Sequence, residues 1–182
     1  MAILKIAQLG HPILRRQAEP VTRNELESGN LEQLMEDLSE TMRDGDGVGI
    51  AAPQVHIPKR IIVVEVKSND KHPDRQPVPL TVMVNPEVIS HSEEQEEGWE
   101  ACLSIPGLKG QVPRWKSLEV IGEDRQGRPM QFEASGFFAR VIQHEMDHVD
   151  GVVYLDRMPD LSTLTFLPEF HKYWEETKRT GR

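Results

Sequence analysis

The segment Gln143-His-Glu-Met-Asp-His148 contains two histidines and a glutamate whose spacing has a chemical meaning. On a helix, His144 and His148 lie one turn apart on the same face, so both imidazoles can bind one metal ion. Glu145 then projects beside the ion, where its carboxylate can accept a proton from a bound water. The pattern therefore predicts a catalytic metal site, against the simpler interpretation of two unrelated helix histidines beside a surface glutamate.

A catalytic site of this type needs a third protein ligand and one open position. One metalloprotease class places a histidine three residues after a glycine, but here Tyr154 follows Gly151 at that spacing. Carboxylates of the kind used by another protease class stand downstream, without a supporting motif, at Glu169, Glu175 and Glu176. The remaining strong ligand is Cys102. A lone cysteine is more often a small buried apolar residue, but beside the histidine motif it predicts a Cys-His-His set, which suits iron(II), zinc, nickel or cobalt.

Composition limits the class of protein that carries these residues. The chain has 182 residues, enough for one domain with a real apolar core. Its single cysteine excludes an intramolecular disulfide and favours a reducing compartment. No signal-peptide pattern opens the chain, and no apolar run approaches the ~18 residues of a membrane span. With 30 acidic against 21 basic residues, nucleic acid is disfavoured as the main partner. We therefore expect a cytoplasmic protein with no membrane association.

The segment that must position the histidines, Gly136–Asp150, is predicted to be a helix. Phe137, Val141, His144 and His148 are spaced i, i+4, i+7 and i+11, which places them on one face. Two histidines therefore share a face that is otherwise apolar. This helix should lie inside the protein, with its polar ligands turned toward the core.

Two other segments have helical spacing. Within Asn24–Arg43, apolar residues three and four apart predict an amphipathic helix with Asn30 as its N-cap and Gly45 as its stop. The leucine spacing of Asp160–Thr177 predicts a C-terminal helix, which Pro168 should bend or restart because proline has no backbone N–H.

Four segments have the composition of β-strands. The β-branched runs Ile61–Val66 and Leu80–Val84 predict two strands joined by a polar, exposed loop. Ser117–Gly122 and Met130–Ala134 flank a glycine-containing turn and predict a hairpin. The small residues of Ile50–Gln54 suit neither a long helix nor a regular strand, so this stretch should bring backbone close to another group.

The motifs together are more specific than any one of them. Gly47-Val-Gly-Ile-Ala-Ala-Pro-Gln54, Glu100-Ala-Cys-Leu-Ser-Ile-Pro106 and the histidine motif follow one another along the chain, after Leu9-Gly-His-Pro-Ile-Leu-Arg15. In this order they closely resemble the signature motifs of bacterial peptide deformylases, and the resemblance runs to about Met158. It implies an α+β fold of mixed β-sheets packed around a central helix that carries the His-Glu-x-x-His motif. Residues 1–158 would be the catalytic domain and 159–182 a helical extension of it.

The resemblance also implies an activity. A metal-dependent hydrolase of this family removes the N-formyl group from the initiator methionine of newly synthesised polypeptides and releases formate. By resemblance, Cys102, His144 and His148 bind the metal, commonly Fe²⁺, with a water in the fourth position, and Zn²⁺, Ni²⁺ or Co²⁺ fits the same ligands. Glu145 is the general base and later the general acid. The implied partners are N-formylmethionyl nascent peptides, with the ribosome nearby.

Further residues would bind the substrate. By resemblance, the side-chain amide of Gln54 and the backbone N–H of Leu103 are the oxyanion donors, and Gly49 offers main-chain hydrogen bonds to an extended peptide. For Gln54 the simpler interpretation is a loop-closing hydrogen bond. We expect the walls of an apolar methionine pocket to be Val48, Leu103, Phe137 and Val141.

The family usually has glycine immediately before the motif cysteine, Cys102, where the chain has Ala101. If the position needs a positive φ, the extra Cβ costs about 1 kcal/mol; in a regular strand the methyl group is harmless or crowds the cleft. We also hypothesise that Glu100 pairs with Arg114 and holds the strand that carries the ligand.

Three other functions account for part of the pattern. A His-Glu-x-x-His metallopeptidase that cuts internal peptide bonds explains Glu145 but neither Cys102 nor Gln54. A metal-stapled ribosome-binding module would not need Glu145 as a base. A Cys and His thiol hydrolase would work without a metal, so chelators would leave its activity intact.

Overall fold

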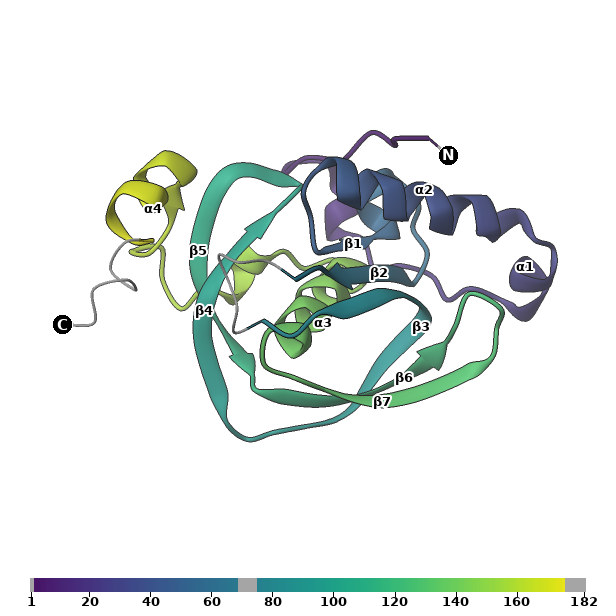
Figure 1. The fold of residues 1–182 in the computed structure, drawn as a ribbon. Helices are drawn as coiled ribbons and strands as arrows, with labels where there is room; N and C mark the ends of the chain where they lie inside the picture. The colour runs from purple at the N-terminus through teal and green to yellow at the C-terminus, as the bar shows by residue number, and fades with distance from the viewer. Residues whose placement is uncertain (1, 69–74, 176–182) are drawn as a thin grey trace.

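The computed structural model describes residues 2–68 and 75–175, in which two antiparallel sheets surround a central helix (Figure 1). The larger sheet has the strand order β1-β2-β3-β6-β7, and the smaller has the order β4-β5-β8. The strands of the larger sheet are β1 (Gly49–Ala51), β2 (Ile61–Val66), β3 (Val78–His91), β6 (Ser117–Glu123) and β7 (Pro129–Ser135). Those of the smaller sheet are β4 (Gln95–Cys102), β5 (Ile105–Trp115) and β8 (Thr165–Phe166).

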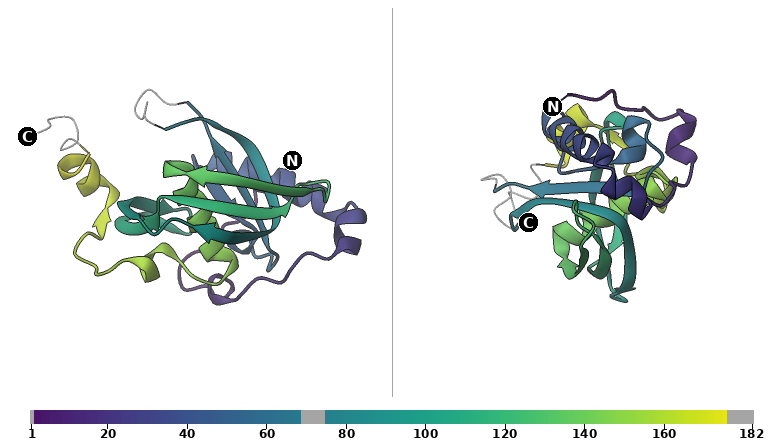
Figure 2. Two further views of the ribbon diagram at one scale, coloured as in Figure 1. Left: turned by 90° about the horizontal axis from the view of Figure 1, so that it is seen from below. Right: turned by 90° about the vertical axis from the view of Figure 1, so that its right-hand side faces the viewer.

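The helices are distributed unevenly around these sheets (Figures 1 and 2). They are α1 (Arg23–Glu27), α2 (Asn30–Asp44), α3 (Gly136–Val149) and α4 (Leu167–Tyr173), with 3₁₀ turns at Pro12–Arg15, Ala52–Val55 and Tyr154–Arg157. Helix α3 contacts β1, β2, β5, β6 and β7 and is the central helix, whereas α4 lies at the opposite end of the molecule from α1. The expected α+β fold around the histidine-bearing helix is confirmed.

Apolar packing fixes α3 against the larger sheet. Ala139, Ile142 and Val149 on the helix are completely buried, as are Ile62 and Val64 on β2. Full burial of one such aliphatic side chain contributes about 1.5–3 kcal/mol. This cluster holds one side of the helix, so the histidine face turns toward the smaller sheet.

The amphipathic helix predicted within Asn24–Arg43 is confirmed as α2, but its predicted N-cap is wrong. Helix α2 begins at Asn30, and its N-cap is Gly29, which has a φ of 74°. Because glycine has no side chain, the cap makes no side-chain hydrogen bond. The left-handed glycine turns the chain out of the short helix α1, so Asn30 is already helical. Gly45 stands at the C-cap as predicted.

The strand predictions are confirmed in kind, with one strand much longer than expected. β2 has the predicted bounds, and β6 pairs with β7 as a hairpin from Ser117 opposite Ser135 to Glu123 opposite Pro129. β3 extends from Val78 to His91, so the expected loop ends earlier than predicted, and residues 69–74 of that loop lie outside the described residues. Asn85, with a φ of 50°, and a register shift interrupt β3 and hide its second half from a periodicity argument.

The C-terminal helix begins later than its leucine pattern predicts, and residues 176–177 of the predicted range lie outside the described residues. Leu161 and Leu164 precede it, and Thr165–Phe166 forms strand β8 against β5 instead. Pro168 lies in the first turn of α4, where its missing N–H costs nothing, so the proline starts the helix. No helix within the described ranges is long and apolar enough to cross a membrane.

Candidate active site

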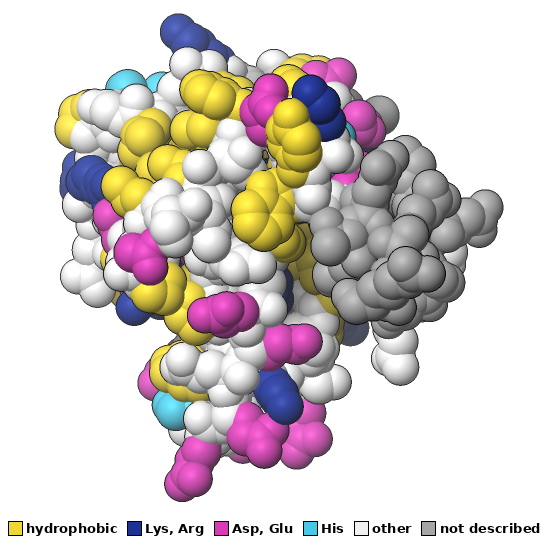
Figure 3. Space-filling model, turned by 90° about the vertical axis from the view of Figure 1, so that its left-hand side faces the viewer, with side chains coloured by type: hydrophobic (Ala, Val, Ile, Leu, Met, Phe, Trp, Pro, Cys, Tyr) yellow, Lys and Arg dark blue, Asp and Glu magenta, His cyan; other side chains and the backbone are white. Residues whose placement is uncertain are grey.

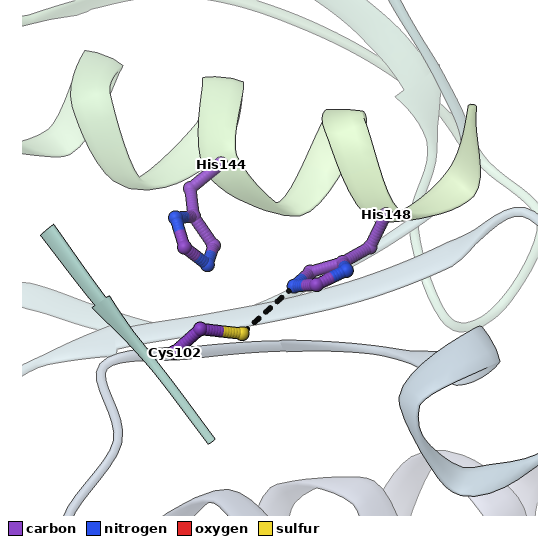
Figure 4. A group of neighbouring side chains, drawn as sticks. All are labelled: Cys102, His144 and His148. Atoms are coloured by element: carbon purple, nitrogen blue, oxygen red, sulfur yellow. Dashed lines mark hydrogen bonds between the residues drawn. The ribbon is translucent and has the colours of Figure 1, made fainter. Parts of the chain in front are cut away.

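Three side chains from two elements converge on one point (Figure 4). Cys102 ends β4, at the tight turn into β5, and faces His144 and His148 on α3. Their ligand atoms all lie within 4.8 Å of one another, and Cys102 Sγ is 3.2 Å from His148 Nε2. Donor atoms around one tetrahedral ion lie about 3.3–3.6 Å apart. All three side chains are buried, so the set fits a single divalent cation, and no second group of this kind exists among the described residues.

The first histidine is oriented by a buried carboxylate. His144 Nδ1 donates to Glu100 Oε2 over 2.8 Å, which leaves Nε2 directed at the ligand cluster. Arg114 donates to both Glu100 oxygens at 2.9 and 3.0 Å, so the hypothesised pair is present. Although burial raises the pKa of Glu100, the hydrogen bonds from His144 and Arg114 outweigh it and hold that pKa at about 2. Glu100 is therefore ionised at neutral pH and fixes the ring of His144, as carboxylates behind metal-binding histidines do.

Two residues to which no sequence motif assigned a role extend this network. Arg140, on α3, donates to Glu100 Oε1 at 2.9 Å and to the carbonyl of Val112 at 2.7 Å. Asp147, the residue immediately before His148, accepts a 2.7 Å hydrogen bond from Arg114. The only sequence signal for Asp147 is its place inside the motif, and Arg140 carries no signal because its partners come from distant strands.

Ala101 does not have a positive φ, so the expected cost of its Cβ does not arise. It lies in β4, between Glu100 and the ligand Cys102, at a point where the register against β5 shifts. Its methyl group lines the cleft.

Glu145 occupies the position expected of a general base. Its side chain is buried beside His144, and its Oε2 has no hydrogen-bond partner in the described part of the chain. A Cβ built on Gly49 would lie only 2.3 Å from Glu145 Oε1, so the glycine in β1 makes room for the carboxylate. Burial raises the pKa of Glu145 to about 7. Such a carboxylate can accept and return a proton near neutral pH.

Gln54 combines the two interpretations that its sequence position allows. Its Oε1 accepts a 2.8 Å hydrogen bond from the N–H of Ala51 and closes the 3₁₀ turn after β1. Its Nε2 lies 3.2 Å from Ser104 Oγ and 3.6 Å from Cys102 Sγ. One end of the amide is thus a structural anchor, and the other presents N–H groups beside the ligand cysteine.

A cavity of about 450 Å³ opens onto this centre. Cys102, His144, Glu145 and Gln54 line it, and His148 lies deeper, 1% exposed. The structure also brings the expected substrate-binding residues together in its wall: Val48, Gly49, Leu103, Phe137 and Val141. Phe137 and Val141 also pack against the apolar core between α3 and the larger sheet, so they belong to the core as well as to the cavity wall.

The mouth of the cavity contains residues that the sequence did not indicate. Arg75 stacks over the Phe137 ring at 3.9 Å, and Lys109 stands above the Phe170 ring at 4.1 Å. Burial and the nearby Arg75 lower the pKa of Lys109. Trp99 completes the mouth from β4. These residues follow no sequence motif. They come together because β5 and α4 pack against each other, which the sequence does not reveal.

Comparison with known proteins decides the family. The model of the polypeptide deformylase family matches residues 3–163. The chain belongs to this family. Peptide deformylase 2 of Pseudomonas putida is 44% identical over 88% of this chain and 90% of its own length, and peptide deformylase 1 of Bordetella pertussis is 43% identical over 86% and 88%. A crystal structure of the class I type b peptide deformylase from Acinetobacter baumannii with Met-Ala-Ser bound is 42% identical and has a TM-score of 0.83. The match covers 86% of this chain and 99% of that one.

Family membership establishes the reaction. The protein is a metal-dependent hydrolase that removes the N-formyl group from the initiator methionine of newly synthesised polypeptides and releases formate. A Cys-His-His site with a buried carboxylate beside it is consistent with this chemistry.

Proposed function

We propose that deformylation takes place at the Cys102, His144 and His148 centre, with Glu145 as the general base. The observation that carries this proposal is the buried Glu145 carboxylate, one oxygen of which has no hydrogen-bond partner among the described residues and whose pKa burial raises to about 7. A purely structural metal site would not need such a group. A divalent cation bound there supplies Lewis-acid activation of water and of the formyl carbonyl.

Different groups of the protein transfer the proton and stabilise the developing negative charge. Glu145 accepts a proton from the attacking water while a C–O bond forms at the formyl carbon. Gln54 Nε2 and the N–H of Leu103 donate to the oxygen on which negative charge develops, and each such donor contributes on the order of 10²–10³ in rate. When the C–N bond breaks, Glu145 returns the proton to the leaving nitrogen, which yields formate and a free methionine amine.

The wall of the cavity accounts for the orientation of the substrate. The N–H and C=O of Gly49 pair with the extended peptide in the manner of an added strand. The methionine side chain enters the apolar pocket of Val48, Leu103, Phe137 and Val141. An Asp at Val141 should therefore reduce the preference for formyl-Met-Ala over formyl-Gly-Ala; unchanged discrimination would remove Val141 from the pocket.

A formate-release assay tests the proposal. Formyl-Met-Ala should be hydrolysed, the activity should disappear after chelation and return with metal, and casein should remain uncut. Activity that survives chelation would indicate a thiol hydrolase instead. Casein cleavage without deformylation would indicate an endopeptidase, and full activity of Cys102→Ala would refute the ligand assignment.

We further propose Fe²⁺ as the cellular metal, held by the thiolate and the two imidazoles. The soft, electron-rich ligand set suits it, although the same set accepts Zn²⁺, Ni²⁺ and Co²⁺. Anaerobic purification followed by elemental analysis tests this identity. A preparation that is fully active and contains zinc but no iron would contradict it.

We propose that the protein acts in the cytoplasm, close to ribosomes, because a formylated terminus is most accessible before the chain folds. Cosedimentation with translating ribosomes tests this; absence from the ribosomal fraction at low salt would count against it. We also retain residues 1–158 as the catalytic domain and 159–182 as its extension. Deletion from residue 159 onward should then leave a folded chain that still binds metal.

A further inference from the structure

Arg140 connects the helix that carries the two histidines with the strand that carries the cysteine. It lies on α3 one turn before His144, and its side chain is 11% exposed. Its Nη1 donates to Glu100 Oε1 at 2.9 Å, while His144 Nδ1 donates to the other oxygen of the same carboxylate at 2.8 Å. One carboxylate on β4 therefore binds two successive turns of α3. This arrangement fixes the helix along the strand that ends at Cys102.

The guanidinium of Arg140 also binds main-chain oxygens of two strands. Nη1 donates to the carbonyl of Val112 on β5 at 2.7 Å and lies 3.4 Å from that of Gly98 on β4. Nη2 donates to the carbonyl of Glu96, also on β4. Hydrogen bonds from an ionised donor are stronger than those between neutral groups. Because Gly98 stands opposite Val112 in the ladder, one side chain ties α3 to both strands at this point.

Gly98 provides the space in which the guanidinium lies. A Cβ built on Gly98 would lie 2.8 Å from Arg140 Cζ and 2.9 Å from its Nε and Nη2, whereas ordinary van der Waals contacts begin at 3.4 Å. Gly98 does not have a positive φ, so its backbone conformation alone would accept other residues. The close approach of Arg140 is therefore the feature that favours glycine at this position of the strand.

The strand β4 needs such an attachment because little else joins it to α3. Within the described residues it pairs with β5 alone, and α3 packs mainly against β1, β2, β5, β6 and β7. The side chains of Glu96 and Glu97 on β4 are exposed, and Figure 3 shows acidic side chains at the surface of the lower part of this face. The inward-facing Glu100 and the carbonyls that Arg140 binds thus attach the cysteine strand directly to the histidine helix.

We propose that Arg140 is a positioning residue for the metal centre, which holds Cys102 within reach of the ion that the two histidines bind. It acts through the Glu100 carboxylate and through the carbonyls of β4 and β5, and not by contact with the reacting atoms. The proposal rests on the ligand assignment proposed above, because Cys102 and the histidines must share one ion.

Chelator competition with Co²⁺ and the visible absorption spectrum of the Co²⁺-loaded protein test this role, because both report on the ligands without a substrate. Arg140→Met has a side chain of comparable length without donors. It should weaken Co²⁺ affinity by about tenfold, the lower end of the range for groups that orient metal ligands, and lower the intensity of the Co²⁺ bands. Arg140→Lys keeps the charge but lacks the planar fork that reaches several oxygens, so the affinity should recover only in part.

Gly98→Ala tests the same contact without removing the charge, because the added Cβ displaces the guanidinium. It should weaken Co²⁺ affinity in the wild-type background and have no further effect in the Arg140→Met background. Arg23→Met is the matched control. Arg23 also donates to a main-chain carbonyl, that of Gly127 at 3.1 Å, and to a carboxylate, that of Glu27 at 2.7 Å, but it does not line the cavity. This variant should keep the wild-type affinity and spectrum.

The outcomes separate positioning from other roles of Arg140. Wild-type Co²⁺ affinity in Arg140→Met, even with a lower melting temperature of the metal-free protein, would show a purely structural role and overturn the proposal. Full affinity in Arg140→Lys would show that charge alone matters and would also overturn it. Should Arg140→Met fail to fold, Gly98→Ala decides, and wild-type affinity and spectrum in that variant would refute the positioning role. Equal Co²⁺ affinity in Cys102→Ala and the wild type would instead refute the ligand assignment itself.

Discussion

Replacement of Gly49 by alanine should displace the proposed catalytic carboxylate. The added Cβ would lie 2.3 Å from Glu145 Oε1 and 2.8 Å from its Cδ, whereas ordinary van der Waals contacts begin at 3.4 Å, so the carboxylate must move by about 1 Å. Gly49 does not have a positive φ, so its backbone can accept alanine and the overlap with Glu145 is the main cost. A misplacement of this size lowers kcat by about 10²-fold, equivalent to about 2.7 kcal/mol. Overpacking should also lower the free energy of unfolding by about 1–3 kcal/mol.

A double-mutant cycle assigns the effect to this contact. Formate release and thermal unfolding would be measured for Gly49→Ala, Glu145→Ala and the double variant, with metal content determined for each. The three atoms nearest the added Cβ all belong to Glu145, so Glu145→Ala removes them. Gly49→Ala should then cost less than about 0.5 kcal/mol in stability and less than about twofold in the residual kcat. A full loss of rate from Gly49→Ala in the Glu145→Ala background would refute the reasoning.

Other perturbations test the rest of the site. Cys102→Ala should lose most bound metal and formate release together, as elemental analysis and the assay would show; metal at full occupancy would contradict its role as a ligand. Gln54→Ala should lower kcat by on the order of 10²–10³ while the metal content stays constant. An unchanged kcat would show that Gln54 is not an oxyanion donor and has only the structural role of accepting a hydrogen bond from the N–H of Ala51. Glu100→Gln should weaken metal affinity about 10–100-fold in a chelator competition, and full affinity would show that the His144 contact does not matter. Because the pKa of Glu100 is about 2 in the folded protein, below its unfolded value, its contribution to stability is present above about pH 4.3 and is lost as the pH falls toward 2. Urea unfolding of the metal-free Glu100→Gln variant should therefore show a weaker loss of stability between pH 5 and 3, and an identical pH profile would contradict the ionised buried carboxylate.

The sequence by itself determined the chemistry and the local elements that carry it. The spacing of His144 and His148 places both rings on one helix face whatever surrounds the helix, because helical periodicity is a local property. The same holds for the β-branched run of β2 and for the hairpin of β6 and β7, whose bounds followed from residue type and turn composition. The observed bounds differ from the predicted ones where a neighbouring element sets them, as at the start of α2 at Asn30 and in the second half of β3.

Only the tertiary structure decided what surrounds the ligands. Arg114 and Arg140 reach Glu100 because β4 pairs with β5 in one register and α3 lies across both; a slip of one residue would turn these side chains to the other face. Burial raises the pKa of Glu145 to about 7, and the position of Glu145 in the motif does not predict this value. Leu167 enters the cavity wall because β8 adds to β5. These features depend on contacts between residues distant in the chain, whose proximity and burial arise only when the sheets close around α3.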